Sequence, residues 1–149
     1  METLFAKQTL DQSIDRINRL QPDKQPVWGK MNATQMLDHC SETMKVVRGQ
    51  KQIKRSFISY TLGTMLKKNF YNDKPFHKNG PTHPDFIITT TSDFEQAKQQ
   101  LIDHLVAFQE GGVEKCTSEP HAFFGKITRE QWGIGMYKHL DHHLQQFGV

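Results

Sequence analysis

The sequence lacks cysteine motifs, long apolar runs and a signal peptide, and each absence argues against one class of protein. The chain has only two cysteines, Cys40 and Cys116, and no CxxC pair, which argues against a cysteine zinc site. No stretch stays apolar for the ~18 residues that a membrane-spanning helix needs. The N-terminal residues show no apolar run behind basic residues, so no signal peptide is expected. These absences predict a reduced, cytoplasmic protein without membrane contact.

The remaining composition is that of one globular domain. The 149 residues are enough to bury a core without disulfides, and we expect a single domain over residues 1–149. Hydrophobic residues make up 36% and charged residues 23%, so the chain is neither membrane-like nor disordered. The net charge of +3 is mild, and no motif for reading bases is present. We therefore expect no specific nucleic-acid partner.

Helical periodicity predicts four principal helices. Apolar residues recur three and four positions apart in the ranges 9–20, 32–48, 92–110 and 128–147. The last three ranges begin with a cap-and-return pair: Asn32 with Gln35, Ser92 with Glu95, and Thr128 with Gln131. The predicted fold class is all-α, a four-helix bundle with a long crossover between the second and third helices.

The crossover is harder to interpret. Residues 56–71 look helical, but their apolar side chains do not form one narrow face, so we expect a buried crossover helix, interrupted at Gly63. Residues 72–84 and 112–125 have loop composition, and residues 86–91 suit a short extended segment. Between Lys45 and Lys78 there are nine Lys and Arg residues and one acid, a net charge of +8 against −5 for the rest. A patch for nucleic acid or anionic ligands is one interpretation, but a solvated basic face over a buried apolar stripe is favoured.

The eight histidines are the most unusual feature, and two of them have metal-ligand spacing. His139 and His143 lie four residues apart, so on a helix both face the same side and can hold one ion. At about 100° per residue they share the arc of the apolar side chains around them, whereas His142 lies off its edge. His39, on the flank of the second helix's apolar stripe, is the candidate third ligand.

Three neutral imidazoles leave positions open for water or substrate, as in catalytic zinc sites. The competing interpretation is that each histidine simply makes a hydrogen bond. Two neighbouring acids, Asp38 and Asp141, can either orient an imidazole or form surface salt bridges, and the second role is favoured. The thiol of Cys40 lies on the apolar stripe and is expected to be buried and inert. The other histidines are expected at the surface or in loops: His77, His83, His104 and His121.

Two segments resemble a known family. The C-terminal residues HAFFGKITREQWG (121–133) and YKHLDHHLQQFG (137–148) resemble the end of the DinB/YfiT-like metalloenzyme superfamily, most closely a branch known chiefly as a domain of unknown function. The residues PVWGKMNATQMLDH (26–39) are similar to the start of the second helix in that branch. The resemblance covers nearly the whole chain, although the middle matches only loosely.

The resemblance implies an up-down-down-up four-helix bundle that holds a divalent metal ion. Its ligands correspond to His39, His139 and His143, and zinc or nickel is expected before iron or manganese. Some relatives transfer low-molecular-weight thiols such as bacillithiol or mycothiol. The expected function is therefore metal-dependent hydrolysis or thiol transfer on a small molecule, with a possible homodimer. The alternative is a helical bundle that binds a small ligand without turning it over.

Overall fold

The computed structural model describes residues 1–55, 57 and 59–149, and the regular elements among them are helices joined by loops. No strand occurs among these residues, although His121 and Gly125 form an isolated antiparallel bridge. This agrees with the predicted all-α class. The elements are α1 (Lys7–Arg19), α2 (Ala33–Val47), η1 (Ser59–Gly63), α3 (Thr64–Leu66), α4 (Lys68–Tyr71), η2 (Pro84–Phe86), α5 (Phe94–Gly111), η3 (Val113–Lys115) and α6 (Arg129–Gln146).

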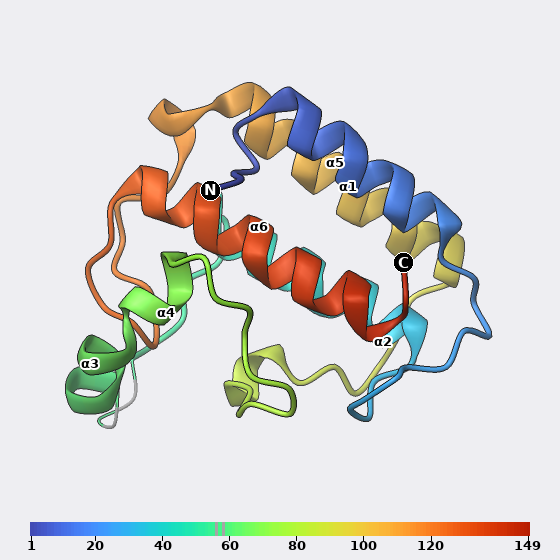
Figure 1. The fold of residues 1–149 in the computed structure, drawn as a ribbon, viewed down its shortest axis with the longest axis horizontal. Coiled ribbons are helices and arrows are strands. Elements are labelled where there is room, and N and C mark those ends of the chain that lie inside the picture. Colours follow the sequence, from blue (N-terminus) through green and yellow to red (C-terminus); the bar gives the residue numbers. More distant parts are fainter. Residues whose placement is uncertain (56, 58) are drawn as a thin grey trace.

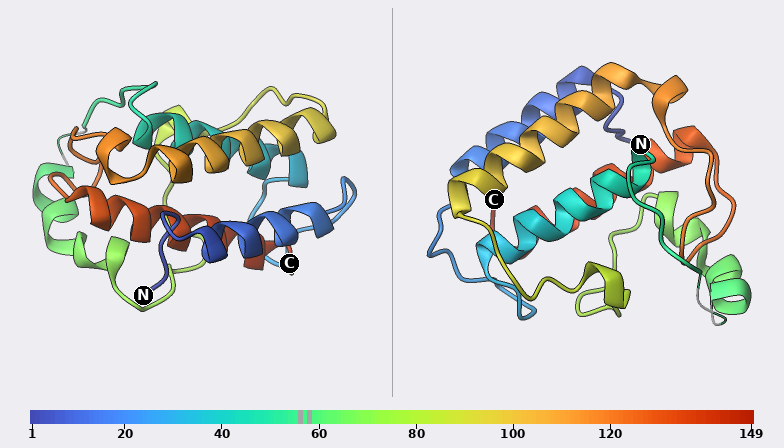
Figure 2. Two further views of the ribbon diagram at one scale, coloured as in Figure 1. Left: turned by 90° about the horizontal axis from the view of Figure 1, so that it is seen from above. Right: turned by 180° about the vertical axis from the view of Figure 1, so that it is seen from behind.

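The four long helices pack side by side (Figure 1). Helix α5 contacts α1 and α2, and helix α6 contacts the same two helices from the other side. The colour gradients in Figures 1 and 2 show that α1 and α6 run in one direction and α2 and α5 in the opposite one. This arrangement brings α2 and α6, the helices that carry the candidate histidines, into contact.

Capping explains where the long helices begin. Asn32 and Gln35 form a reciprocal capping box at α2, and Thr128 and Gln131 form another at α6, as predicted. The prediction at the third helix was wrong, because α5 is capped by Asp93, whose carboxylate accepts from the amides of the first turn. Ser92 instead turns toward α2 and donates to the Asp38 carboxylate. An aspartate one position on competes for the same role, so the sequence pattern mislocated the cap by one residue.

The apolar stripes of the long helices meet in one core. The predicted inner positions of α2 and α5 are buried, and so is most of the predicted arc of α6. These side chains supply burial without any cross-link, since both cysteines are free. The core side chains on the four long helices are Leu10, Ile17, Ala33, Met36, Leu37, Cys40, Met44, Val47, Phe94, Ala97, Leu101, Leu105, Phe108, Trp132, Met136, Leu140 and Leu144.

The crossover departs from prediction. In place of one helix over residues 56–71, the chain forms η1, a π-helical turn, followed by α3 and α4. Ser56 and Ile58 lie outside the described residues. The expected interruption at Gly63 corresponds to the junction of η1 and α3, where a Cβ would lie 1.7 Å from the Phe123 carbonyl oxygen. Only glycine permits that approach of the two backbones.

The crossover is also mostly exposed, which contradicts the expectation of a buried helix. Its end is anchored in the core, where Phe70 packs against α6 at Gly135, which has no side chain to block it. The Lys138 ammonium on α6 donates to the carbonyl oxygens of Asn69 and Asn72 and so holds the end of α4. No helix in the described part of the chain is long and apolar enough to cross a membrane.

Candidate metal centre

His39 lies on the face of α2 that turns toward α6. Its side chain is buried, with 4% of its surface exposed. The Nδ1 atom lies 3.0 Å from the backbone carbonyl oxygen of Phe86, in η2. A carbonyl oxygen only accepts hydrogen bonds, so Nδ1 carries the proton and donates it. The lone pair of a neutral His39 is therefore on Nε2, which points away from η2.

His139 and His143 present their rings from consecutive turns of α6. Their ring centroids lie 4.6 Å apart, and each lies near the His39 ring, at 5.1 Å for His139 and 4.8 Å for His143. The predicted arc of α6 therefore does face α2. Helical rotation predicted the pairing of His139 with His143, and the place of His39 on the flank of α2, with the family resemblance, made it the third candidate.

One ligand atom from each of the three imidazoles lies within 4.8 Å of the others, so the group can hold a metal ion. The Nε2 atoms of His39 and His139 are 3.1 Å apart. With zinc–nitrogen bonds of 2.0–2.1 Å and tetrahedral angles, two ligand nitrogens are separated by about 3.3 Å. The spacing of this pair is close to that value, so His39 and His139 fit two positions of a tetrahedral ion, and His143 lies near enough to supply a third ligand.

Gln146 fixes the third imidazole. Its Oε1 atom accepts from His143 Nδ1 at 2.9 Å, and its Nε2 atom donates to the Trp28 carbonyl oxygen at 2.7 Å. The second bond determines which end of the amide is oxygen, so Nδ1 of His143 carries the proton and Nε2 has the free lone pair. Gly29 makes room for this amide, because a Cβ there would lie 2.3 Å from the Gln146 Nε2 atom.

Burial holds all three imidazoles in the neutral form that binds metal. It is the largest cause of the lowered pKa of His39, opposed in part by the hydrogen bond to Phe86. Burial, followed by the charge of His39, lowers the pKa of His143 to about 3. The pKa of His139 lies well below its ordinary value for the same first reason, with His143 and His39 adding to it.

His142 does not belong to the group. Its ring lies 5.3 Å from that of His143 but faces Trp28 and Phe76, at centroid distances of 5.6 Å and 6.0 Å. It is therefore part of an aromatic wall beside the site. This agrees with its predicted place off the arc.

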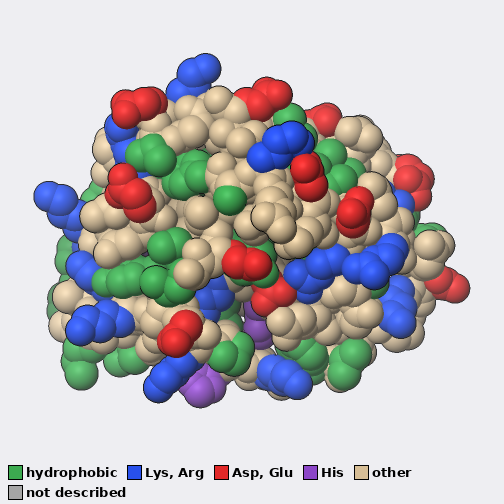
Figure 3. All heavy atoms as spheres, turned by 45° about the horizontal axis from the view of Figure 1, so that its top comes forward, with side chains coloured by type: hydrophobic (Ala, Val, Ile, Leu, Met, Phe, Trp, Pro, Cys, Tyr) green, Lys and Arg blue, Asp and Glu red, His purple; other side chains and the backbone are tan. Residues whose placement is uncertain are grey.

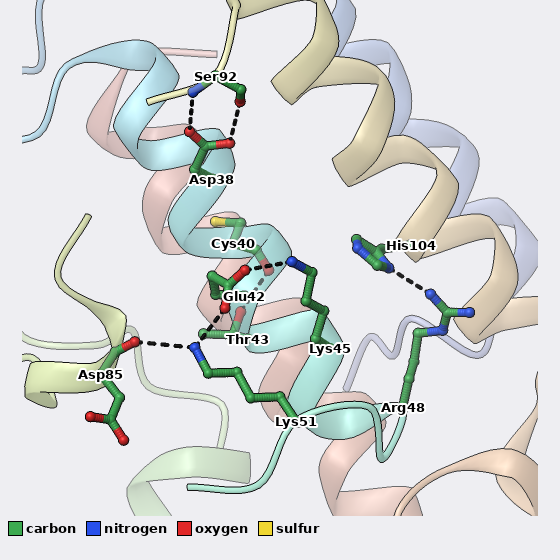
Figure 4. Close-up of polar contacts among 10 residues, drawn as sticks. All are labelled: Asp38, Cys40, Glu42, Thr43, Lys45, Arg48, Lys51, Asp85, Ser92 and His104. Atoms are coloured by element: carbon green, nitrogen blue, oxygen red, sulfur yellow. Dashed lines mark hydrogen bonds and ion pairs between the residues drawn. The ribbon is translucent and has the colours of Figure 1, made fainter. Parts of the chain in front are cut away.

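The two neighbouring acids bind other partners, and the salt bridge predicted for each is found for Asp141 but not for Asp38 in the described part of the chain. Asp141 forms a salt bridge with Arg16 at 2.7 Å, which ties α6 to α1. Asp38 accepts from the backbone and hydroxyl of Ser92 (Figure 4). The nearby Cys40 thiol is buried, and burial raises its pKa, which makes it inert as a nucleophile.

The remaining histidines lie in loops or at helix surfaces, as expected. His77 is exposed, and His83 caps η2. His104 on α5 contacts the Arg48 guanidinium (Figure 4). His121 seats the loop before α6, because its Nδ1 accepts from the amides of Phe123 and Phe124.

The basic segment is only partly neutralised. Glu42 binds both Lys45 and Lys51 at 2.6 Å (Figure 4). The view in Figure 3 shows acidic and basic side chains interspersed over one face of the molecule. That face carries no field of a single sign.

Sequence reasoning missed the groups that orient the ligands. The carbonyl oxygens of Phe86, in η2, and of Trp28, in the α1–α2 loop, approach the ligands only through the tertiary structure. Gln146 lies three residues after His143, a spacing that places it on the same helix face. That spacing is the one signal in the sequence that pointed to it, and it is too common to be specific.

Comparison with known proteins identifies one relationship. A sequence model of the family described as a protein of unknown function (DUF1569) matches residues 3–148. No curated protein and no solved structure matches the chain.

Proposed function

The chain belongs to the DUF1569 family, whose function is unknown, and we propose from its own site that it is a divalent-metal-dependent enzyme acting on a small molecule. The reaction proposed is hydrolysis or the transfer of a low-molecular-weight thiol. One observation carries the proposal: three imidazoles converge, and at least two have their protonated nitrogen held by an oxygen on the far side of the ring. That arrangement aims lone pairs at a common point. The rings of His39 and His143 are buried, and that of His139 is half-buried.

Zinc or nickel is the proposed ion, with iron or manganese as weaker candidates. Imidazole ligands suit zinc, nickel, copper and iron, whereas manganese prefers oxygen ligands. Three imidazoles occupy only three positions of a tetrahedral ion. The fourth is left for water or substrate, which is the pattern of catalytic zinc sites.

The chemistry that such an ion supplies when bound is a lowered pKa for its water or thiol, toward about 7 in the case of zinc-bound water. The protein's part is to hold His39, His139 and His143 in position and to keep them neutral. The Phe86 carbonyl and the Gln146 amide restrict the rotation of two of the rings. The rings of Phe76 and Trp28 pack against His142, on the side of His143 away from the other two ligands.

We further infer that the family is related to the DinB/YfiT-like superfamily and shares its up-down-down-up four-helix bundle. The opposed directions of α1 and α6 against α2 and α5 support this relationship. The three histidines also occupy the helices that the resemblance implies for the ligands. A homodimer and cytoplasmic localisation remain part of the proposal.

The alternative is a bundle that binds a small ligand without turnover. It is favoured by the engagement of Asp38 with Ser92 and of Asp141 with Arg16, which leaves neither acid to act as a general base. If the protein is an enzyme, its reaction would therefore depend on the bound ion and the substrate, without a protein general base from these two acids.

The test is turnover by protein loaded with zinc or with nickel. Two reactions are assayed: conjugation of cysteine to 1-chloro-2,4-dinitrobenzene, and hydrolysis of 4-nitrophenyl acetate. The proposal predicts metal-dependent turnover that is lost in His139→Ala and retained in His142→Ala. Stoichiometric metal without turnover in either assay would favour the ligand-binding alternative, and failure to bind any divalent ion would contradict the enzyme proposal.

A further inference from the structure

The crossover carries an exposed apolar surface, which we call the apolar protrusion (residues 57 and 59–66). Each of its large apolar side chains is exposed: Phe57 by 87%, Met65 by 80%, Tyr60 by 60%, Leu62 by 44% and Leu66 by 37%. In Figures 1 and 2 η1 and α3 stand away from the four long helices. Contiguous exposed apolar side chains of this kind mark interaction sites.

The packing of η1 holds this surface outward. Ser59 and Gly63 are the buried positions of η1, and they lie one turn apart on its inner side. Gly63 touches the backbone at Phe123 so closely that rotation of the element about its axis would bring a side chain into that contact. The apolar side chains therefore cannot turn into the core while Gly63 keeps this contact.

The chain on both sides of the apolar protrusion carries cations and no acid. No acid occurs between Thr43 and Asn72, a stretch with seven Lys and Arg residues. Within the described part of the chain, no carboxylate forms a salt bridge with the four nearest cations, which are Lys54, Arg55, Lys67 and Lys68. Self-association through this surface would bring these like charges together, so an anionic partner is favoured over a second copy.

A cavity adjoins the protrusion. Its volume is about 250 Å³, and its lining includes two cations, Lys51 and Arg55, and one acid, Glu119. Arg55 links the cavity to the apolar surface, because its guanidinium lies 4.1 Å from the centre of the Tyr60 ring. A group with negative charge can therefore approach the cations while an apolar chain contacts the protrusion.

We propose that the apolar protrusion and its flanking cations form a docking face for an anionic phospholipid bilayer. Three of its side chains, Leu62, Met65 and Leu66, gain from burial among acyl chains. The aromatic rings of Phe57 and Tyr60 suit the boundary between headgroups and acyl chains. The surface stands out from the protein rather than forming a groove, which suits insertion into a bilayer. This departs from the sequence expectation of no membrane contact, which rested on the absence of a membrane-spanning apolar stretch and of a signal peptide.

The test is co-sedimentation of the full chain with vesicles of phosphatidylcholine, alone or mixed in equal parts with phosphatidylglycerol. Wild type should bind only the mixed vesicles, and added salt should weaken that binding. Met65→Glu should abolish it. The double variant Lys54→Gln and Lys68→Gln should weaken it by about fivefold for each cation removed. The matched control is Val27→Glu, an exposed apolar position in the α1–α2 loop, which should bind as wild type does.

Three outcomes would overturn the proposal. The first is equal binding by wild type and Met65→Glu, and the second is no binding of wild type to mixed vesicles. The third is a dimer in solution that Met65→Glu converts to monomer, which would make the face a contact between two copies. Met65 is 80% exposed and is not part of the core, so Met65→Glu should keep its metal content. Measuring that content distinguishes failure of the docking proposal from failure of the metal centre.

Discussion

At the residue scale, the orientation of His143 depends on Gln146 and, through it, on the Trp28 carbonyl oxygen. Without the amide, the His143 ring is free to rotate and to exchange its protonated nitrogen. Groups that orient metal-bound histidines contribute 10–100-fold to metal affinity. The role of Gln146 is therefore measurable apart from that of the three ligands.

We expect Gln146→Leu to weaken zinc binding by about 10–100-fold while leaving a folded protein. Competition with a chromogenic chelator measures the affinity. The matched control is Gln145→Leu, because Gln145 is exposed and bonds only to Asp141. Equal affinities for the two variants would show that Gln146 does not act on the site.

His121 provides a pH test at a buried histidine that is not one of the three candidate ligands. Burial, followed by the charge of Arg55, lowers its pKa from 6.5 to about 3. At a pH between these two values, His121 is therefore protonated in the unfolded chain but neutral in the folded chain. The stabilising effect of a neutral His121 is thus fully present above about pH 6.5 and is lost as the pH falls toward 3.

We expect His121→Asn to lessen the loss of stability on acidification, since the amide oxygen retains an acceptor for Phe123 and Phe124 but does not titrate. Between pH 7.5 and pH 5 the wild-type free energy of unfolding should fall by about 1–2 kcal/mol more than that of the variant. Urea unfolding of metal-free protein measures it, with the exposed His77→Asn as control. A pH dependence unchanged by His121→Asn would argue against a buried neutral ring.

At the element scale, the long helices were predictable because their apolar periodicity coincides with burial. Helix α2 was expected over 32–48 and forms over Ala33–Val47, with the predicted stripe buried. The exposure of the crossover was not predictable, because its apolar side chains were expected to be buried in the core. Its inner face is instead made by Ser59 and Gly63, two small residues that the sequence does not mark as buried.

The cap of α5 offers an element-scale prediction. Asp93→Ala should lower the free energy of unfolding by about 1 kcal/mol, because the first-turn amides of Glu95 and Gln96 lose their acceptor. Asp103→Ala, in the exposed middle of the same helix, should cost less than half as much. Chemical unfolding of both variants decides the matter, and a larger loss in Asp103→Ala would mean that the cap is elsewhere.

At the scale of the whole molecule, the metal centre and the core are separate. The apolar stripes of four helices are buried without any contribution from an ion. We expect chelator-treated protein to keep its far-ultraviolet circular dichroism spectrum and a cooperative thermal transition, while activity is lost. A collapse of helicity on metal removal would show that the ion is structural.

The sequence also anticipated how the molecule assembles its candidate site. Rotation about α6 separated His143 from His142, and the flank of α2 supplied His39. The groups that orient these histidines could not be predicted from the sequence. The Phe86 and Trp28 carbonyl oxygens come from segments that approach the long helices only in the folded chain. Backbone acceptors carry no signature in a sequence.

The central claim is that His39, His139 and His143 hold one divalent ion. The most direct measurement is metal content by mass spectrometry after incubation with zinc or nickel at neutral pH, on wild type and on single alanine variants at residues 39, 139, 142 and 143. We expect one equivalent in wild type and in His142→Ala, none in His139→Ala or His143→Ala, and severely reduced content in His39→Ala. Loss of metal in His142→Ala with retention in His143→Ala, or no metal in wild type, would contradict the account.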